Sequence, residues 1–311
     1  MTRSAGRTLA QAKINLALRV LEKQADGFHS IETVFLRLDF GDDVRVRVRK
    51  SGRSLKCEAL RRENTEENLG YRAAVAYTAK VGWPGGFAIE IDKRIPIGGG
   101  LGGGSADAAA VLRILNALSP SPLNTPQLLD LAGELGSDVP FLASDFVMAL
   151  AWGRGEILTE LPPLPATDVQ LIVPAFGIST AEAYDALDRS RHDQQPRPPA
   201  LTVEMFHTWH DVLKNSVNDF EEVVRDRFAA GGLEPLLFQK RNPTDRSLVR
   251  MTGSGSTIFV VQNVAPVSPD RVGMPRSSQN TPALRLARVS LDTKIITTCT
   301  AASVVPVELL D

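Results

Sequence analysis

A run of glycines between residues 98 and 104 constrains the fold of this chain more than any other stretch. Six of these seven residues are glycine, and the alanine-rich segment 105–118 follows with apolar residues at helical spacing. Segment 87–92, before the run, alternates apolar and polar residues in its second half, as a strand does. The predicted order is therefore strand, glycine loop, helix. Bare backbone N–H groups and the positive end of a helix dipole would meet there, which favours an anion such as phosphate.

Several nucleotide folds share this order, so the loop needs further tests. Gly98, Gly100 and Gly103 satisfy the dinucleotide pattern G-x-G-x-x-G, but so dense a run matches it almost automatically. A P-loop requires a lysine at the helix start, where this sequence has Ser105 as a predicted N-cap and Asp107 in the predicted first turn. A nicotinamide enzyme would need a strand ending in an acidic residue about 20 residues later, and the sequence there is helical. A flexible glycine turn without a ligand stays open as the alternative.

Composition limits the class of protein. The chain has 311 residues, 43% of them hydrophobic, which suits two domains with buried cores. Its 35 basic and 36 acidic residues nearly cancel, so no broad attraction to nucleic acid or anionic membranes is expected. Cys57 and Cys299 are too few for a disulfide framework and fit a reducing cytosol. The longest apolar run, 146–152, is too short to span a bilayer, and we expect a cytoplasmic protein.

Three further features stand out along the chain. Residues 9–21 read as a strand with Lys13 and Asn15 on one face. Asp138 lies among apolar residues at a predicted helix start, where it either caps the helix or serves a function. The small-residue loop 252–257 precedes a buried strand and is either a phosphate contact or only a turn.

The remaining predictions concern the second half of the chain. Prolines at 162–165 indicate a linker, and residues 189–200 indicate a mobile surface loop. A helical stretch is predicted around 209–228. Segment 264–282 is rich in proline and serine and is predicted to be irregular.

Taken together, these motifs resemble the small-molecule kinases of the GHMP superfamily. The most similar branch phosphorylates a methylerythritol that carries a cytidine diphosphate group, in the non-mevalonate isoprenoid pathway. The resemblance covers most of residues 9–261, and the motifs that carry it are 12–16, 26–29, 67–69, 98–105, 135–140, 153–156 and 253–257.

The resemblance implies a two-domain α+β fold with the active site in a cleft. Residues 1–163 would form the nucleotide-binding domain and residues 164–311 a ferredoxin-like domain. The sequence departs from the family after Val261, where a helix usually follows but prolines recur from Pro266 to Pro282. This departure concerns the layout of the second domain and leaves the expected chemistry untouched.

The resemblance also implies ATP as phosphoryl donor, with Mg²⁺, and transfer to the 2-hydroxyl of the methylerythritol. Asp138 would act as base and Lys13 as its charge partner, because a nearby cation favours the ionised form of a buried carboxyl group. The implied ATP-binding residues are Asn68, Pro96, Gly98, Gly99, Gly100, Leu101, Gly102, Gly103, Gly104 and Ser105, the last also a candidate Mg²⁺ contact. The implied substrate-binding residues are Asn15, Phe28, His29, Asp138, Thr180 and Tyr184.

The resemblance assigns Phe28 and His29 to the cytosine ring. An aromatic side chain can stack on the face of such a ring, and polar groups can form hydrogen bonds at its edge. The family more often has tyrosine in place of Phe28, so stacking is kept and a hydroxyl is lost. Tyr184 would close the other face, and Thr180 would lie near the diphosphate or the erythritol. We expect a small-molecule substrate only, with no nucleic acid or membrane partner, and a monomer or weak homodimer.

Other acceptors within the superfamily remain alternatives, namely mevalonate, phosphomevalonate and homoserine. From a different class, a catalytically silent sugar sensor on the same scaffold is possible, although the presence of both Lys13 and Asp138 argues against it.

Overall fold

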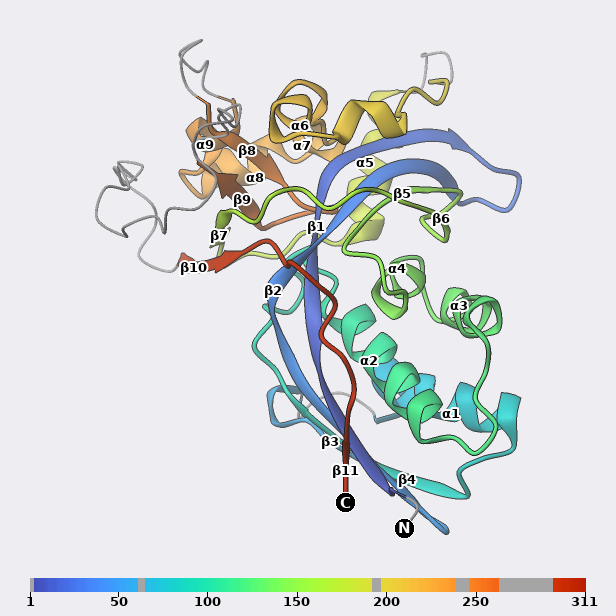
Figure 1. Cartoon of the computed structure of the whole chain (residues 1–311). Coiled ribbons are helices and arrows are strands. Elements are labelled where there is room, and N and C mark those ends of the chain that lie inside the picture. Colours follow the sequence, from blue (N-terminus) through green and yellow to red (C-terminus); the bar gives the residue numbers. More distant parts are fainter. Residues whose placement is uncertain (1–2, 61–64, 192–196, 239–245, 263–292) are drawn as a thin grey trace, which may run out of the picture.

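The computed structural model describes residues 3–60, 65–191, 197–238, 246–262 and 293–311. These residues form two sheets flanked by helices (Figure 1). The larger sheet has seven strands, β1 (Ala5–Lys23), β2 (His29–Arg49), β3 (Arg53–Lys56), β4 (Gly86–Asp92), β5 (Met148–Trp152), β6 (Ile157–Glu160) and β11 (Glu308–Leu310). The smaller sheet has four, β7 (Asp168–Val173), β8 (Leu248–Met251), β9 (Ile258–Val261) and β10 (Lys294–Cys299).

The larger sheet has the order β11-β1-β2-β4-β3, and β5 joins β2 beside it and carries β6. Its pairs are antiparallel except for β3 with β4. The smaller sheet has the order β10-β7-β9-β8 and is antiparallel. The register of β1 and β2 is interrupted near Lys13 and Asn15, between Gln11 and Lys13 and again between Asn15 and Ala17. Such irregularities redirect side chains, and here they adjoin two predicted site residues.

Four helices cover one face of the larger sheet, α1 (Leu69–Val81), α2 (Gly103–Leu118), α3 (Thr125–Gly133) and α4 (Val139–Ala143) (Figure 1). The core between them is apolar, and α2 is buried along most of its length because alanines let it approach both the sheet and α1. Five helices accompany the smaller sheet, α5 (Thr180–Ser190), α6 (Trp209–Asn215), α7 (Phe220–Val223), α8 (Arg225–Ala230) and α9 (Glu234–Phe238). Short 3₁₀ helices occur at η1 (Glu58–Leu60), η2 (Thr65–Glu67) and η3 (Val203–Phe206).

The predicted strand, glycine loop and helix are present as β4, the loop and α2, but the predicted helix start is wrong. The N-cap is Gly102, with φ +72°, and Ser105 lies within the helix. Asp107 therefore falls beyond the first turn. The positive φ lets the chain turn into the helix before Ser105 is reached, a conformation that strongly favours glycine.

The single helical stretch predicted around 209–228 is also wrong, because α6, α7 and α8 are separate. Between them the chain lies against β1: the Leu18 amide donates to the Val217 carbonyl oxygen at 2.7 Å, and the Ser216 hydroxyl donates to the Leu16 carbonyl oxygen at 2.5 Å. Pairing with a strand far away in the sequence thus overrides the local helical pattern.

The predicted division at residues 163 and 164 stays a prediction. Strands β1 to β6 precede it and β7 to β10 follow it, while β11 returns to pair with β1, with Ala5 opposite Leu310. Segment 264–282, predicted to be irregular, lies outside the described residues, as does part of the predicted loop 189–200. None of the helices in the described ranges has the length and apolarity required to cross a bilayer.

Candidate active site

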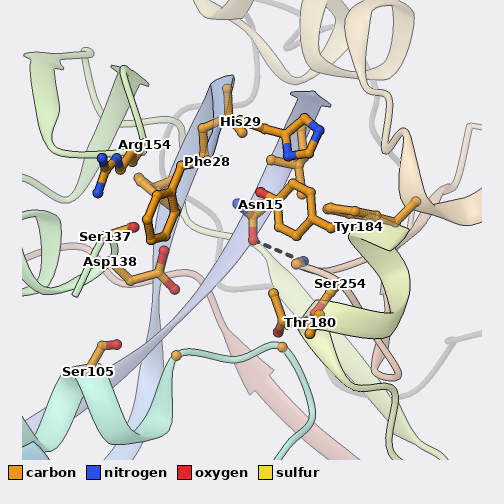
Figure 2. Close-up of a pocket in the computed structure, with 18 of the residues that line it drawn as sticks. Asn15, Phe28, His29, Ser105, Ser137, Asp138, Arg154, Thr180, Tyr184 and Ser254 are labelled. Carbon is orange, nitrogen blue, oxygen red and sulfur yellow. Dashed lines mark hydrogen bonds between the residues drawn. The ribbon is translucent and has the colours of Figure 1, made fainter. Parts of the chain in front are cut away.

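A cavity of about 560 Å³ lies where β1, the glycine loop, α4, α5 and the loop before β9 meet (Figure 2). It is lined by Lys13, Asn15, Leu18, Lys23, Gly27, Phe28, His29, Ile31, Phe35, Gly100, Gly102, Ser105, Ser137, Asp138, Arg154, Thr180, Ala181, Tyr184, Asp185, Asp188, Phe220, Gly253 and Ser254. Predicted site residues that are far apart in the sequence therefore share one space.

Lys13 and Asp138 form an ion pair in this cavity, with 3.1 Å between Nζ and Oδ2. The Lys13 side chain is 4% exposed and that of Asp138 is 29% exposed. Asp138 occupies the N-cap position of α4, but its carboxylate makes no capping hydrogen bond. Capping therefore does not account for Asp138, whose carboxylate instead meets the buried ammonium group.

The glycine loop holds Lys13 in place from the other side. The Lys13 backbone N–H donates to the Leu101 carbonyl oxygen at 3.1 Å. A Cβ added to Gly102 would lie 3.1 Å from both Cε and Cγ of Lys13, so the lysine stem packs directly on the loop backbone. The glycine loop thus fixes the path of the lysine stem that carries the ammonium group.

Asn15 connects the same ammonium group to the loop before β9. Its Oδ1 accepts from Lys13 Nζ at 2.8 Å, from the Gly253 amide at 3.0 Å and from Thr252 Oγ1 at 3.2 Å. The backbone N–H of Asn15 in turn donates to Thr252 Oγ1 at 3.1 Å. The loop 252–257 is therefore more than a turn, since it closes one side of the cavity.

The two small-residue loops also touch each other. The Thr257 amide donates to the Gly99 carbonyl oxygen at 3.2 Å, and a Cβ on Gly100 would lie 2.2 Å from the Thr252 carbonyl oxygen. Gly98, Gly100 and Gly102 all have positive φ, between +72° and +76°. The density of glycine thus has a packing reason as well as a conformational one.

A second cavity of about 200 Å³ lies on the other side of the glycine loop. It is lined by Glu67, Asn68, Leu69, Lys93, Pro96, Ile97, Gly98, Gly103, Gly104 and Asp107. The first amides of an α-helix have no acceptor within the helix, and the α2 N-cap, being glycine, has no side chain to supply one. The start of α2 therefore presents N–H donors between two cavities, which suits a polyphosphate running from one cavity to the other.

Aromatic rings form the far end of the larger cavity (Figure 2). Phe28 is 56% exposed, and the Arg154 guanidinium lies over its ring at 4.0 Å from the centroid. The Arg154 guanidinium also forms an ion pair with Asp26, which holds it over the Phe28 ring. Phe28 offers a flat face that is backed by a cation on one side.

His29 and Tyr184 form the opposite wall, with stacked rings whose centroids are 4.9 Å apart and whose planes differ by 19°. His29 Nε2 lies 2.6 Å from Asp188 Oδ1, and Lys23 Nζ lies 2.6 Å from Asp188 Oδ2. Burial and then the charge of Asp138 raise the pKa of Tyr184 to about 12, so its hydroxyl stays protonated at neutral pH. Burial works to raise the pKa of Asp188, but the hydrogen bonds from Lys23 and His29 outweigh it and lower that pKa.

Comparisons with known proteins show which family the chain belongs to. Residues 68–145 match the family described as GHMP kinases N terminal domain. The protein named 4-diphosphocytidyl-2-C-methyl-D-erythritol kinase from Desulfotalea psychrophila is 37% identical over 258 residues, which are 81% of this chain and 84% of the relative. The protein of the same name from Pelotomaculum thermopropionicum is 45% identical over 264 residues, 81% of this chain and 87% of the relative.

The chain belongs to the 4-diphosphocytidyl-2-C-methyl-D-erythritol kinase family. A crystal structure of 4-(cytidine 5'-diphospho)-2C-methyl-D-erythritol kinase matches with a TM-score of 0.61 and 34% identity, covering 82% of this chain and 89% of that one. Homoserine kinase from Cytophaga hutchinsonii, at 16% identity and a TM-score of 0.59, shares the fold. The predicted two-domain α+β GHMP fold and the prediction of an ATP-dependent small-molecule kinase are confirmed.

In this kinase family member, the sequence-predicted residues divide between the two cavities. Asn15, Phe28, His29, Ser105, Asp138, Thr180 and Tyr184 line the larger one with Lys13, whereas Asn68 and Pro96 line the smaller one. Asn68 also caps α1, accepting from the Tyr71 amide at 3.1 Å, and Thr180 Oγ1 lies 3.0 Å from Ser254 Oγ. Their predicted ligand contacts stay predictions.

Sequence reasoning missed Arg154 and Asp188, which touch the aromatic walls, and a buried charged group beside the smaller cavity. In that group Lys93 Nζ donates to Asp42 Oδ2 at 2.5 Å and to Asp107 Oδ2 at 2.8 Å. Arg154 lies in a motif that carries the kinase resemblance, which was the available signal. For Asp188 and the Lys93 group the sequence contains no such signal, because their partners are distant in the sequence.

Proposed function

We propose that this chain transfers the γ-phosphoryl group of ATP to the 2-hydroxyl of 4-diphosphocytidyl-2-C-methyl-D-erythritol, a step of the non-mevalonate isoprenoid pathway. The observation that carries the proposal is the Lys13–Asp138 pair, set between the glycine loop and an aromatic-walled cavity. The names and 33–45% identity of the relatives support the choice of acceptor.

In the proposed reaction, the acceptor oxygen bonds to the γ-phosphorus as the bond from that phosphorus to the β–γ bridging oxygen breaks. Asp138 accepts the hydroxyl proton, and ADP leaves with the bridging oxygen. The Lys13 ammonium group offsets the charge of the transferring phosphoryl group and of the Asp138 carboxylate. Most of the rate enhancement in such reactions comes from positioning and electrostatics, which an ion pair with a buried lysine beside the glycine loop can supply.

The nucleotide is proposed to span the two cavities. Its base and ribose would occupy the smaller cavity, against Asn68, Pro96 and Ile97, and its phosphates would cross the start of α2. Open amides of that helix start and the glycine loop would hold the phosphate oxygens.

Magnesium fits the oxygen donors that this cavity offers. Mg²⁺ in kinases is held mainly by substrate phosphates and one or two protein oxygens, and Ser105 and Asp138 line the same cavity as neighbours (Figure 2). Ser105 would hold the ion with the phosphates, and the Asp138 carboxylate is left to accept the hydroxyl proton. When bound, the ion neutralises phosphate charge and orients the terminal group.

The cytidine end would lie between Phe28 and Tyr184, which face the cavity from opposite sides (Figure 2). Phe28 can stack on a base without a hydroxyl group, and base stacking on aromatic rings is worth about 1–3 kcal/mol. His29 Nε2 is engaged with Asp188, so Nδ1 and the backbone are what His29 offers the base. Thr180 and Ser254 would meet the diphosphate or erythritol, and Asn15 its hydroxyl groups.

We further propose that residues 1–163 carry the nucleotide site and that residues 164–311 complete the acceptor site. The balanced charge supports a small-molecule substrate without a nucleic-acid or membrane partner. We propose a cytoplasmic enzyme that is a monomer or weak homodimer.

An acceptor panel tests the proposal. The purified full chain is given ATP, Mg²⁺ and either 4-diphosphocytidyl-2-C-methyl-D-erythritol, mevalonate, phosphomevalonate or homoserine, and ADP release is followed. We expect turnover with the cytidyl acceptor, a phosphate ester at its 2-oxygen by ³¹P NMR, and no turnover in excess EDTA. Turnover confined to another acceptor would assign a different GHMP activity, and ATP binding without any turnover would indicate the silent sensor.

A further inference from the structure

We propose that Thr33 is a positioning residue for phosphoryl transfer, acting through the side-chain amide of Asn15 on the Lys13 ammonium group. The inference rests on the proposed function of the Lys13–Asp138 pair. Thr33 itself does not line the cavity, lies on β2 and is fully buried.

The hydrogen bonds of Thr33 leave its hydroxyl only one arrangement. Thr33 Oγ1 donates to the Ala17 carbonyl oxygen at 2.7 Å, and a hydroxyl has a single hydrogen to donate. Its contact with Asn15 Nδ2, also 2.7 Å, must therefore be one in which Thr33 accepts. Thr33 thus requires an N–H group, rather than an oxygen, on the side of the Asn15 amide that faces it.

This requirement and the donors on the other side of the Asn15 side-chain amide demand the same orientation. Oδ1 must face the opposite side, where it meets three donors: Lys13 Nζ, the Gly253 amide and Thr252 Oγ1. A reversed amide would place its NH₂ group against an ammonium and a backbone N–H, neither of which can accept. Thr33, Lys13 and Gly253 therefore all require the same orientation, and Thr33 holds the Nδ2 end of the amide whose Oδ1 accepts from the ammonium group.

The position of the ammonium group depends on that acceptor. Lys13 Nζ has Asn15 Oδ1 at 2.8 Å and Asp138 Oδ2 at 3.1 Å, and it lies 5.5 Å from the centroid of the Phe35 ring. The side chain is nearly buried, so water does not readily substitute for a lost partner. Without a correctly oriented Asn15, the ammonium group would move toward Asp138 and away from its place between the carboxylate and the incoming phosphoryl group.

The test replaces Thr33 with valine, which has nearly the same shape and no hydroxyl. We expect kcat to fall about tenfold or more, because small misplacements of catalytic groups have effects of this size, while KM for ATP and for the acceptor changes less than about threefold. Thr33→Ser keeps the hydroxyl and should restore most of the wild-type kcat. Thr8→Val is the matched control: Thr8 is a buried β1 residue of the same sheet, with its hydroxyl bonded to the Val305 and Pro306 carbonyl oxygens, and its loss should leave kcat unchanged.

A second comparison separates positioning from a general structural role. In an Asn15→Ala background, Thr33→Val should lower kcat by less than about twofold, because the relay is already broken. A full tenfold loss there, a lower melting temperature at unchanged kcat, or a Thr33→Ser variant as slow as Thr33→Val would each overturn the inference. Wild-type turnover of the cytidyl acceptor is measured in the same series, so a failure of the proposed function is seen separately from a failure of the Thr33 relay.

Discussion

Lys13 shows how a buried charge is accommodated in this fold. Its side chain is 4% exposed, and an unpaired ammonium group in that position would be strongly destabilising. Asp138 supplies the opposite charge and Asn15 supplies a neutral acceptor, so the ammonium group is paired before any ligand enters. A phosphoryl group arriving at this pair would meet charges that need little rearrangement, which is the arrangement that favours electrostatic catalysis.

The first prediction concerns Asp138. Replacing it with asparagine keeps the shape and removes the proton acceptor, so we expect kcat to fall about 100-fold or more. Binding of ATP, measured by titration calorimetry, and the melting temperature should stay near wild type. Asp145→Asn, an exposed carboxylate just after the other end of α4, is the control and should keep full activity. Near-normal turnover of Asp138→Asn would remove Asp138 from the mechanism.

A second residue-scale prediction concerns Asp107, which is 1% exposed beside Lys93 and Asp42. Burial, assisted by the Asp42 charge and opposed by Lys93, raises the pKa of Asp107 to about 7. The folded state thus holds this proton more tightly than the unfolded chain, whose Asp pKa is about 4. The contribution of Asp107 to stability is therefore fully present below about pH 4 and declines as the pH rises toward 7.

Asp107→Asn removes this titration. We expect the ligand-free variant to gain stability relative to wild type as the pH rises from about 4 to 8, by about 1 kcal/mol or more, in urea unfolding at each pH. Asp130→Asn, an exposed position on α3, should show no such trend. A difference between Asp107→Asn and wild type that stays constant across this pH range would contradict the raised pKa.

At the scale of elements, the sequence predicts what depends on neighbours along the chain and misses what depends on distant contacts. The glycine loop with α2, and Lys13 on its strand, follow from local pattern. The start of α2 at Gly102 depends on a positive φ that no pattern of caps reveals, and the separation of α6 from α7 depends on residues 216–218 lying against β1. The Lys93 group was missed for the same reason, since its carboxylates come from positions 42 and 107.

The docking of the two loops predicts a difference between two glycines of similar backbone conformation. Gly98 and Gly100 have φ +72° and +76°, but a Cβ on Gly98 meets nothing within 4 Å, whereas one on Gly100 lies 2.2 Å from the Thr252 carbonyl oxygen. Gly98→Ala should reduce the free energy of unfolding by about 1–2 kcal/mol, the cost of a left-handed non-glycine residue. Gly100→Ala should reduce it by about 3 kcal/mol or more, because backbone must also move.

Urea unfolding of both variants without nucleotide measures this difference. Gly98→Ala is the matched control for the strain of the positive φ alone. Equal losses of stability in the two variants would show that the loops are not packed together as described.

For the whole molecule, the important arrangement is the placement of two cavities on either side of the glycine loop. Ile97 is 63% exposed and lines the smaller cavity, while Phe28 is 56% exposed and lines the larger one. Neither side chain belongs to the buried core, so each can be shortened with little effect on folding. If the nucleotide and the acceptor occupy different cavities, changes in one cavity should affect only one substrate.

Steady-state kinetics with each substrate varied in turn tests this separation. We expect Ile97→Ser to raise KM for ATP about fivefold through lost apolar contact, and to leave KM for the cytidyl acceptor unchanged. Phe28→Ala should raise KM for the cytidyl acceptor about tenfold or more through lost stacking, and should leave KM for ATP unchanged. Ile157 is exposed to a similar extent, 57%, but lines neither cavity, so Ile157→Ser should change neither constant. If Ile97→Ser raised KM for the acceptor, or Phe28→Ala raised KM for ATP, the two substrates would have to share one cavity. The proposed path of the phosphates across the start of α2 would then be wrong.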